Sequence, residues 1–359
     1  MDDRYDVVIV GAGPAGAAAA KALTGSGLRT AVLEKNTLPR YKMCSGVLFP
    51  AAVKFISDVF GTVPAEARCE PQEVIGLRGL LSIDGPAIDL PFSAMNTVMG
   101  EPGLPENGLN IKRPELDLWL CKQSDASLVD DCMFITSFQG GADMTLRVKH
   151  NGEEREFETR YLVGADGPNS RVRKTTFSGF DRGLRLIPNY EEWYRGEIDL
   201  EPGWLYLFFD RSLSGFMATI FHKDDAITAV SGAARGESAR SRFEDFTTHL
   251  KDKHGLKITQ VAERHGIVLN DMSATGNYCL GEGSVLLVGE AAGFLRSAEG
   301  ITPALVTGKA AGEAILKSVE SGRPAMDFYT PATANEMDTC KMVHKLNEDV
   351  AGFNMFTRE

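Results

Sequence analysis

Apolar and polar positions follow a clear order at the start of the chain. Residues 5–36, YDVVIVGAGPAGAAAAKALTGSGLRTAVLEKN, contain an apolar run at 7–10, a glycine turn, an alanine-rich stretch opened by Pro14, and a second apolar run that ends at Glu34. Short apolar runs bounded by glycines are typical of buried strands, and proline favours the first turn of a helix. The pattern predicts a strand, a helix and a second strand, the βαβ unit of an α/β domain.

Two later stretches also change from an apolar strand to a glycine loop. They are RYLVGADGPNSRVR at 160–173 and GSVLLVGEAAGFLRSAEGITPALVTGKAAGEAIL at 283–316, and the second continues into a helix near Thr302. The pair Asn151-Gly152, between alternating segments, is a strong signal for a hairpin. The nucleotide-binding lobe is therefore expected to combine parallel strands with an antiparallel hairpin.

The segments 72–100 and 178–270 alternate large apolar with polar positions, which is typical of strands in a half-buried sheet. This alternation predicts two apolar stripes: Trp204, Tyr206 and Phe208, and then Phe216, Ala218 and Ile220. The tail from 321 onward has a loose helical spacing of apolar residues. We expect that helix to pack against the nucleotide-binding lobe.

Composition narrows the classes of function. The chain has 359 residues, of which 43% are hydrophobic and 24% charged, and its formal charge is −11. These values indicate a globular protein and argue against nucleic acid as a partner. The six cysteines are scattered and no metal-ligand spacing occurs, which favours a reduced, cytoplasmic setting. No apolar stretch approaches the roughly 20 residues that cross a bilayer, so any membrane contact is expected to be peripheral.

The first glycine turn carries the clearest chemistry. Gly11 allows a tight turn, Gly13 lets a pyrophosphate approach the backbone, and Gly16 lets the helix pack closely on the strand. Glu34 follows the second strand, where a carboxylate can accept hydrogen bonds from ribose hydroxyls. Ala15 and Lys35 adjoin these groups and are also expected to contact the dinucleotide. The stretch therefore predicts a dinucleotide site.

Together, the three strand-to-glycine segments resemble the FAD-binding fold of the p-hydroxybenzoate hydroxylase type. The resemblance covers most of residues 4–320 and implies a Rossmann-like α/β domain that binds FAD, with an inserted antiparallel sheet for the substrate and a C-terminal helical tail. The expected divisions are an FAD-binding domain of 1–71, 101–177 and 271–320, a substrate-binding sheet domain of 72–100 and 178–270, and a helical segment of 321–359.

The resemblance also implies roles for single residues. Asp166 and Gly167 match the family's DG turn beneath the cofactor, and Arg113 matches an arginine that opens a helix and contacts FAD. Gly289 and Glu290 match a motif that commonly ends in aspartate, so the glutamate here is a departure. The residues that match the loop and helix start at the pyrimidine edge of the flavin are Gly300, Ile301 and Thr302.

The stretch LPRYKMCSGVLFP, residues 38–50, decides between branches of the family. Cys44, Ser45 and Gly46 resemble the CGG-type segment of geranylgeranyl reductases, with serine in place of the first glycine. The resemblance implies an FAD-dependent reductase that passes a hydride to a carbon–carbon double bond of an isoprenoid or lipid-like substrate, with Cys44 positioning that substrate or delivering a proton. The expected pocket residues are Tyr206, Phe208, Phe216, Ala218 and His222.

Two other functions stay open on the sequence. One is a flavin monooxygenase that hydroxylates an aromatic or polyketide-like substrate, and the other is a non-catalytic flavin-binding redox module. No second GxGxxG unit marks a nicotinamide domain. The external reductant could be NAD(P)H, ferredoxin or another flavoprotein, and an electron-donor protein is a candidate partner beside the small hydrophobic substrate.

Overall fold

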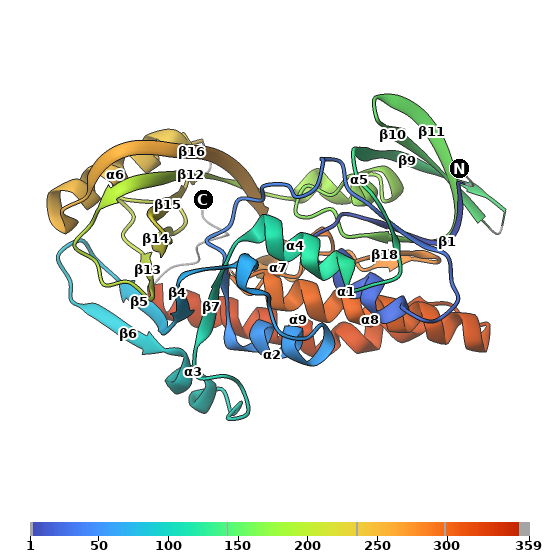
Figure 1. The fold of residues 1–359 in the computed structure, drawn as a ribbon, viewed down its shortest axis with the longest axis horizontal. Helices are drawn as coiled ribbons and strands as arrows, with labels where there is room; N and C mark the ends of the chain where they lie inside the picture. The colour runs from blue at the N-terminus through green and yellow to red at the C-terminus, as the bar shows by residue number, and fades with distance from the viewer. Residues whose placement is uncertain (1–2, 142, 235, 298, 352–359) are drawn as a thin grey trace.

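The computed structural model describes residues 3–141, 143–234, 236–297 and 299–351. Figure 1 shows two lobes, each built on its own sheet, with the helices α8 (Ile301–Ser321) and α9 (Met326–Ala351) beneath the sheet of the first lobe. The first lobe contains the predicted βαβ unit and the second contains the inserted segments. The expected α/β fold with an inserted sheet and a C-terminal helical segment is confirmed.

The sheet of the first lobe has eight strands. Five of them are parallel, in the order β18, β11, β1, β2, β8. An antiparallel extension joins β9 and β10 to β11, and β17 pairs antiparallel with β18. The bounds are β1 Arg4–Val10, β2 Thr30–Leu33, β8 Ser127–Val129, β9 Cys132–Gly140, β10 Asp143–His150, β11 Glu153–Gly164, β17 Gly281–Glu282 and β18 Val285–Leu287. The predicted hairpin at Asn151 and Gly152 joins β10 to β11, and both residues have positive φ.

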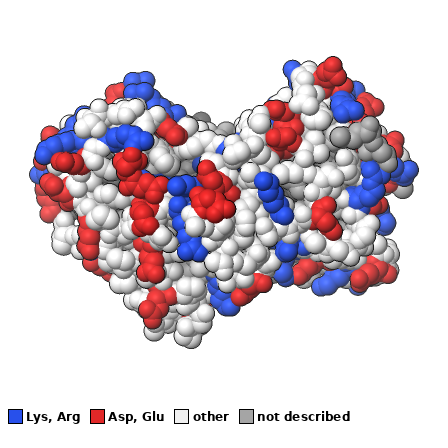
Figure 2. Space-filling view, in the orientation of Figure 1, with Lys and Arg blue, Asp and Glu red and all other residues white. Residues whose placement is uncertain are grey.

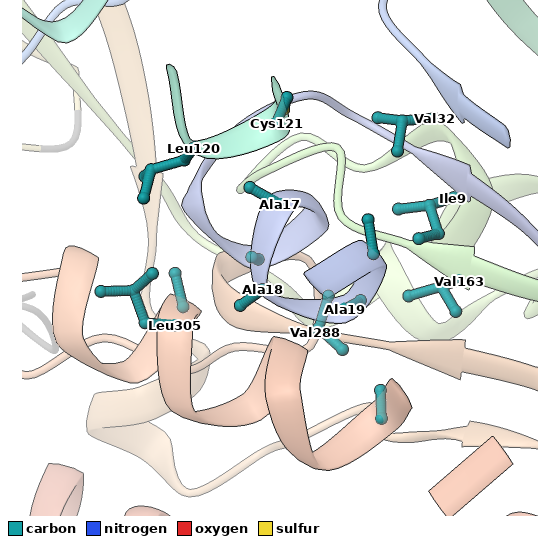
Figure 3. Close-up of a cluster of buried hydrophobic side chains, with 14 of the residues drawn as sticks. Ile9, Ala17, Ala18, Ala19, Val32, Leu120, Cys121, Val163, Val288 and Leu305 are labelled. Carbon is teal, nitrogen blue, oxygen red and sulfur yellow. The ribbon is translucent and has the colours of Figure 1, made fainter. Parts of the chain in front are cut away.

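Helix α1 (Pro14–Leu23) lies between the parallel strands and α8. Gly308 and Gly312 of α8 permit close contact, because a Cβ at these positions would lie 2.1 Å from the Ala15 carbonyl oxygen and 2.7 Å from that of Ala19. Figure 3 shows the alanines of α1 between Ile9 and Val163 of the strands and Leu305 of α8. The alanine-rich composition of α1 therefore sets a short distance between sheet and helix.

The sheet of the second lobe has seven strands in the order β16, β12, β15, β14, β13, β5, β6. All neighbours are antiparallel except β13 and β5, which form a parallel pair. The bounds are β5 Gly76–Leu80, β6 Ala87–Pro91, β12 Leu186–Glu197, β13 Trp204–Phe208, β14 Ala218–Lys223, β15 Ala226–Gly232 and β16 Lys257–Asn270. Helix α6 (Ala239–His254) covers one face through Phe243, Phe246 and Leu250.

A small antiparallel sheet links the lobes, in the order β3, β7, β4. Its strands are β3 Val47–Leu48, β4 Arg68–Val74 and β7 Gly108–Ile111. The remaining helices are α2 Pro50–Val59, α3 Phe92–Val98, α4 Arg113–Lys122, α5 Arg171–Thr176 and α7 Met272–Thr275, and the 3-10 turns are η1 Ala65–Ala67, η2 Phe180–Gly183 and η3 Gly289–Ala291. Because β3 directly follows residues 44–46, this sheet holds the predicted cysteine segment at the junction of the two lobes.

Candidate functional site

Two glycines of the turn between β1 and α1 leave no room for a Cβ. Gly11 has a φ of +114°, and a Cβ there would lie 2.4 Å from the Ala165 carbonyl oxygen. A Cβ on Gly16 would lie 2.0 Å from the carbonyl oxygen of Gly11. Gly13 precedes the helix and offers no side-chain cap, so the first N–H groups of α1 stay available to an anion. This geometry fits the predicted pyrophosphate site.

Glu34 belongs to a buried network of charged groups at the end of β2. Its Oε2 accepts a hydrogen bond from the Ala12 N–H (3.4 Å) and pairs with Nε of Arg40 (3.1 Å). Nη1 of Arg40 lies 2.8 Å from Oδ2 of Asp117, and Asp117 also accepts two hydrogen bonds of 3.0 Å from Arg113. Arg113 thus opens α4, as the resemblance implied, and belongs to the same network as Glu34, while its contact with FAD stays a prediction.

Arg40 and Asp117 are site residues that the sequence interpretation missed. A Cβ on Gly13 would lie 3.8 Å from Nη2 of Arg40, so a guanidinium stands next to the turn where a pyrophosphate would approach. Burial acts to raise the pKa of Asp117, but the charges of Arg113 and Arg40 outweigh it and hold that pKa below its ordinary value. The i, i+4 spacing of Arg113 and Asp117 on α4 is the one signal that could have indicated the pair.

The second glycine turn is held by Asp166. Its carboxylate accepts hydrogen bonds from Oγ of Ser170 (2.5 Å) and from the N–H groups of Arg171 (2.6 Å) and Val172 (3.1 Å). Burial raises the pKa of Asp166, and these hydrogen bonds oppose the shift. Gly167 follows with a φ of +79°. Asp166 therefore shapes this turn by capping α5, which is the structural role expected for it.

A buried arginine joins the second and third turns. Arg173 has no exposed surface and donates to the carbonyl oxygens of Pro168 (3.0 Å) and Ala291 (2.7 Å). Its guanidinium also pairs with Asp181. Arg173 thus links the second and third of the segments predicted to converge on one cofactor.

Glu290 lies at the third turn, next to the start of α8. A Cβ on Gly300 would lie 3.9 Å from its carboxyl carbon. Burial raises the pKa of the Glu290 carboxyl, while the positive charges of Lys42 and Arg113 act to lower it. Its carboxylate accepts no hydrogen bond from any residue that the structure describes. The Glu290 side chain, which is one methylene longer than the usual aspartate, thus lies near the predicted cofactor site. Its carboxylate oxygens are available to accept hydrogen bonds there.

The start of α8 presents a second unsatisfied group. Oγ1 of Thr302 is buried and has no hydrogen-bond partner in the described part of the chain. The Thr302 N–H donates to Oε1 of Glu299 (2.7 Å), another residue missed from the sequence, and burial raises the pKa of Glu299. Ile301 packs into the core of the first lobe. A buried hydroxyl without a partner fits a polar ligand edge, as expected for the flavin.

The cysteine segment is fixed by a buried lysine. Lys223 at the end of β14 donates to the carbonyl oxygens of Ser45 (3.0 Å) and Ile111 (2.8 Å) and to Oδ1 of Asn110 (2.7 Å). Gly46 has a φ of +67°, and a Cβ there would lie 2.4 Å from the Ile111 carbonyl oxygen. These contacts join residues 44–46 to both lobes. Lys223 was missed because the sequence interpretation singled out its neighbour, His222.

Cys44 itself is partly exposed and lies beside Arg113. Burial acts to lower the pKa of the Arg113 guanidinium, but the nearby charges of Asp117 and Cys44 raise it. The Gly46 N–H donates to Sγ of Cys44 (3.4 Å). Cys44 therefore adjoins the same buried charges as the predicted cofactor site.

The expected pocket residues divide between the two faces of the second sheet. Tyr206, Phe208 and Ala218 are buried in the cluster that packs against α6, so they face away from the first lobe. This placement corrects their assignment to the pocket. Phe216 lies in a different cluster, with Leu295 of the first lobe. Of the second predicted stripe, Ala218 and Ile220 thus share the cluster of the first stripe, whereas Phe216, which precedes β14, lies apart from them.

His222 points to the side of the sheet opposite Lys223, because successive strand residues alternate. It lines a shallow surface hollow of about 270 Å³ with Asp224 and Ile227. Burial lowers the pKa of its imidazole. The side chain therefore faces away from the cysteine segment that Lys223 contacts, which corrects the assignment of His222 to the pocket. Lys35, predicted near the cofactor, is exposed beside Glu34.

No group of three or more His, Cys, Asp or Glu side chains that could hold a metal ion occurs in the part of the chain that the structure describes. Within the same residues, every helix is too short or too polar to span a bilayer.

Comparisons with known proteins agree with this geometry. The family described as pyridine nucleotide-disulphide oxidoreductase matches residues 5–205, and an FAD binding domain matches residues 133–294. A geranylgeranyl diphosphate reductase of Rhodobacter capsulatus is 27% identical over 336 residues, which cover 90% of this chain and 78% of that protein.

Solved structures show the same fold at lower identity. A geranylgeranyl bacteriochlorophyll reductase-like protein from Thermoplasma acidophilum superposes with a TM-score of 0.74 at 16% identity, covering 98% of this chain and 84% of that one. Aklavinone-11 hydroxylase, solved with FAD and aklavinone, has a TM-score of 0.67 at 20% identity, covering 92% of this chain and 66% of that one. Reductases and hydroxylases therefore share the architecture found here.

Proposed function

Because the chain belongs to the pyridine nucleotide-disulphide oxidoreductase family and is an FAD-dependent oxidoreductase, we propose that it reduces carbon–carbon double bonds of a hydrophobic, isoprenoid or lipid-like substrate. The observation that carries the proposal is the position of Cys44, partly exposed at the junction of the lobes and beside Arg113. The relative named geranylgeranyl diphosphate reductase supports the choice of substrate class.

The sheet face that looks toward the first lobe supports a hydrophobic substrate. Leu205 and Phe221 lie on this face and pack with Val47, which follows the cysteine segment. Leu207 contacts the neighbouring clusters on the same face. Leu207, which is only partly buried, would offer apolar area on this face to an alkene, and burial of that area would favour binding.

The residues around the glycine turns have the chemistry to hold FAD. Arg40 and the start of α1 would bind the pyrophosphate, Glu34 would bind the ribose, and Thr302 with the start of α8 would bind the ring system. Glu290 would supply the acceptor that aspartate supplies elsewhere in the family. Bound FAD, once reduced, supplies a hydride. The protein orients the alkene, excludes water and positions the Cys44 thiol next to it.

A monooxygenase that hydroxylates an aromatic or polyketide-like substrate is the second candidate. The fold similarity to aklavinone-11 hydroxylase favours it, because the same cofactor lobe serves that enzyme. A non-catalytic flavin-binding redox module is the third. All three use the cofactor site, and they differ in what happens to the electrons of the reduced flavin.

One measurement separates these candidates. The FAD-loaded protein is reduced anaerobically, mixed with geranylgeranyl diphosphate or with an aromatic polyketide, and the flavin spectrum is followed before and after oxygen is admitted. Anaerobic reoxidation that depends on the alkene supports the reductase. Oxygen-dependent reoxidation with incorporation of oxygen into the aromatic compound supports the monooxygenase instead, and reduction without turnover supports the redox module.

The electron donor and the cellular setting belong to the same proposal. NAD(P)H and reduced ferredoxin are the donors to compare, by the rate at which each bleaches the bound flavin. Figure 2 shows acidic and basic side chains interspersed on the face in view, with no broad basic patch that would hold an anionic membrane. We place the protein in the cytoplasm, with at most peripheral membrane contact.

A further inference from the structure

A buried carboxyl of the second lobe contacts the cysteine-bearing loop. Glu191 on β12 has no exposed surface, and the hydroxyl of Tyr41, three residues before Cys44, donates a short hydrogen bond to its Oε2. The Tyr41 ring stacks on His265 of β16, with centroids 3.5 Å apart and planes 15° apart. Glu191 and His265 are direct neighbours across the two strands. The loop is therefore docked on a carboxyl group that the protein has removed from water.

The other oxygen of Glu191 has no partner. Oε1 is buried and accepts no hydrogen bond from the residues that the structure describes. A buried, unpartnered carboxylate oxygen is costly, whereas a neutral carboxyl group carries its proton there and can donate it. The environment agrees, because burial raises the pKa of Glu191 and outweighs the opposing effects of Tyr41, Trp193, His265 and Lys223.

The orientation of β12 directs Glu191 toward the cofactor lobe. Its neighbours Tyr190 and Glu192 point the other way, where Tyr190 packs on Phe243 of α6 and Glu192 accepts from the Tyr190 hydroxyl (3.0 Å). Lys223, which holds the backbone of Ser45, is among the charges that act on Glu191. Glu191 thus shares the sheet face that adjoins the cysteine segment.

We propose that Glu191 is the general acid of the reduction, donating a proton from Oε1 to one alkene carbon while the other carbon receives the hydride. This inference rests on the proposed alkene reduction. The π bond of the alkene breaks and two carbon–hydrogen bonds form, one with the proton of Glu191 and one with the hydride, and its two electrons, that reduced FAD would supply. Glu191 becomes a carboxylate, stabilised by the Tyr41 hydrogen bond, and regains a proton from solvent. Cys44 then positions the substrate and need not supply the proton.

The first test reads the protonation state without turnover. Infrared spectra of the protein at pH 7 are compared for wild type, Glu191→Gln and Glu192→Gln, which carries the same substitution one residue along the strand on the opposite face. We expect the carbonyl band of a neutral carboxyl in wild type and in Glu192→Gln, and its loss in Glu191→Gln. If Glu191→Gln leaves every neutral-carboxyl band unchanged, Glu191 is ionised at pH 7 and the inference is overturned.

The second test uses anaerobic reoxidation of the reduced flavin by geranylgeranyl diphosphate. Glu191→Gln should slow reoxidation by about 100-fold or more with unchanged FAD content, and Glu192→Gln should match wild type. If wild type reoxidises and Glu191→Gln keeps its rate, Glu191 is not the acid, although the reductase proposal stands. If wild type itself does not respond to the alkene, the proposed function and the inference both fail.

A third variant keeps the test decisive if Glu191→Gln does not fold. The Tyr41 hydrogen bond acts to lower the pKa of Glu191, so its removal in Tyr41→Phe should raise that pKa. The proposed reaction needs Glu191 in its protonated form. The pH above which the reoxidation rate falls should therefore be higher in Tyr41→Phe than in wild type. A loop-docking role alone would lower the rate at every pH without moving that pH, and that result would overturn the inference.

Discussion

Arg40 and Asp117 form a buried ion pair that links the loop after β2 to α4, with 2.8 Å between Nη1 and Oδ2. Asp117 is completely buried and Arg40 nearly so, and each has a further partner of opposite charge, Arg113 and Glu34 respectively. The network ties the glycine turn and the loop after β2 to helix α4. It also places two guanidinium groups near the predicted pyrophosphate site.

Asp117→Asn should destabilise the protein by about 3 kcal/mol or more, because the substitution leaves Arg113 buried without its anionic partner. Chemical denaturation monitored by tryptophan fluorescence measures the change. Asp58→Asn is the control, since it removes an exposed i, i+4 pair with Lys54 and should change stability by less than about 1 kcal/mol. Equal changes in the free energy of unfolding would show that the buried network stabilises the protein no more than an exposed ion pair does.

Asp117 should also make the stability of the protein depend on pH. Burial acts to raise the pKa of Asp117, but Arg113 and Arg40 hold it below the ordinary value of about 3.9. A carboxyl with a lowered pKa in the folded state stabilises the fold above its unfolded pKa, and this contribution is lost as pH falls toward the folded pKa. Wild type should therefore lose stability below about pH 4 more steeply than Asp117→Asn. Parallel curves of denaturation midpoint against pH would contradict this.

Gly11→Ala should abolish FAD retention. The new Cβ would lie 2.4 Å from the Ala165 carbonyl oxygen, at a φ of +114° that alanine rarely adopts. Gly27→Ala is a matched control, because Gly27 also has a positive φ but no atom within 4 Å of the added Cβ. The ratio of flavin to protein absorbance after purification measures the result. A yellow Gly11→Ala protein would place the cofactor somewhere other than this turn.

The sequence was sufficient to predict features that depend on local backbone geometry. Gly11 and Gly16 are required by a tight turn, and Asn151 adopts positive φ in the expected hairpin, so residue type and spacing carry the information. Which face of a sheet is covered by a helix or by the other lobe depends instead on packing between segments distant in the chain. Tyr206 and Phe208 were correctly predicted to share a face, but the helix that covers this face, α6, lies more than 30 residues later.

Charged residues of the site were harder to predict for a related reason. Arg40, Asp117 and Lys223 look like ordinary surface residues in the sequence, where charged side chains are most often exposed. Their burial follows from partners distant in the chain: Arg40 and Asp117 are 77 residues apart, and Lys223 reaches Ser45 across 178 residues. Only the tertiary fold brings such groups together, and a single sequence contains no record of that contact.

Cys44 should be the one cysteine of the native protein that reacts quickly with a thiol reagent. The other five, Cys69, Cys121, Cys132, Cys279 and Cys340, are buried, whereas Cys44 is partly exposed. A colorimetric thiol assay should give about one fast equivalent, which Cys44→Ala removes and bound FAD slows. An unchanged fast equivalent in Cys44→Ala would show that the segment does not expose its thiol at the site.

Thr302→Val separates a ligand-binding hydroxyl from a structural one. Oγ1 of Thr302 is buried without a partner among the described residues, so its removal should leave the stability of the FAD-free protein unchanged or higher. If the flavin supplies the missing partner, the Kd for FAD should rise by about 5- to 10-fold, equivalent to about 1 kcal/mol.

Thr307→Val on the same helix gives the contrasting result. The Thr307 hydroxyl accepts from the Gly289 N–H (2.9 Å) and donates to the Pro303 carbonyl oxygen (2.6 Å), so its loss should destabilise the FAD-free protein by about 1 to 3 kcal/mol. Thermal melting of the FAD-free variants and fluorescence titration with FAD give both quantities. If Thr302→Val instead lowers the melting temperature and leaves the Kd unchanged, the hydroxyl serves the protein fold, and the start of α8 is not the flavin contact that its buried oxygen indicates.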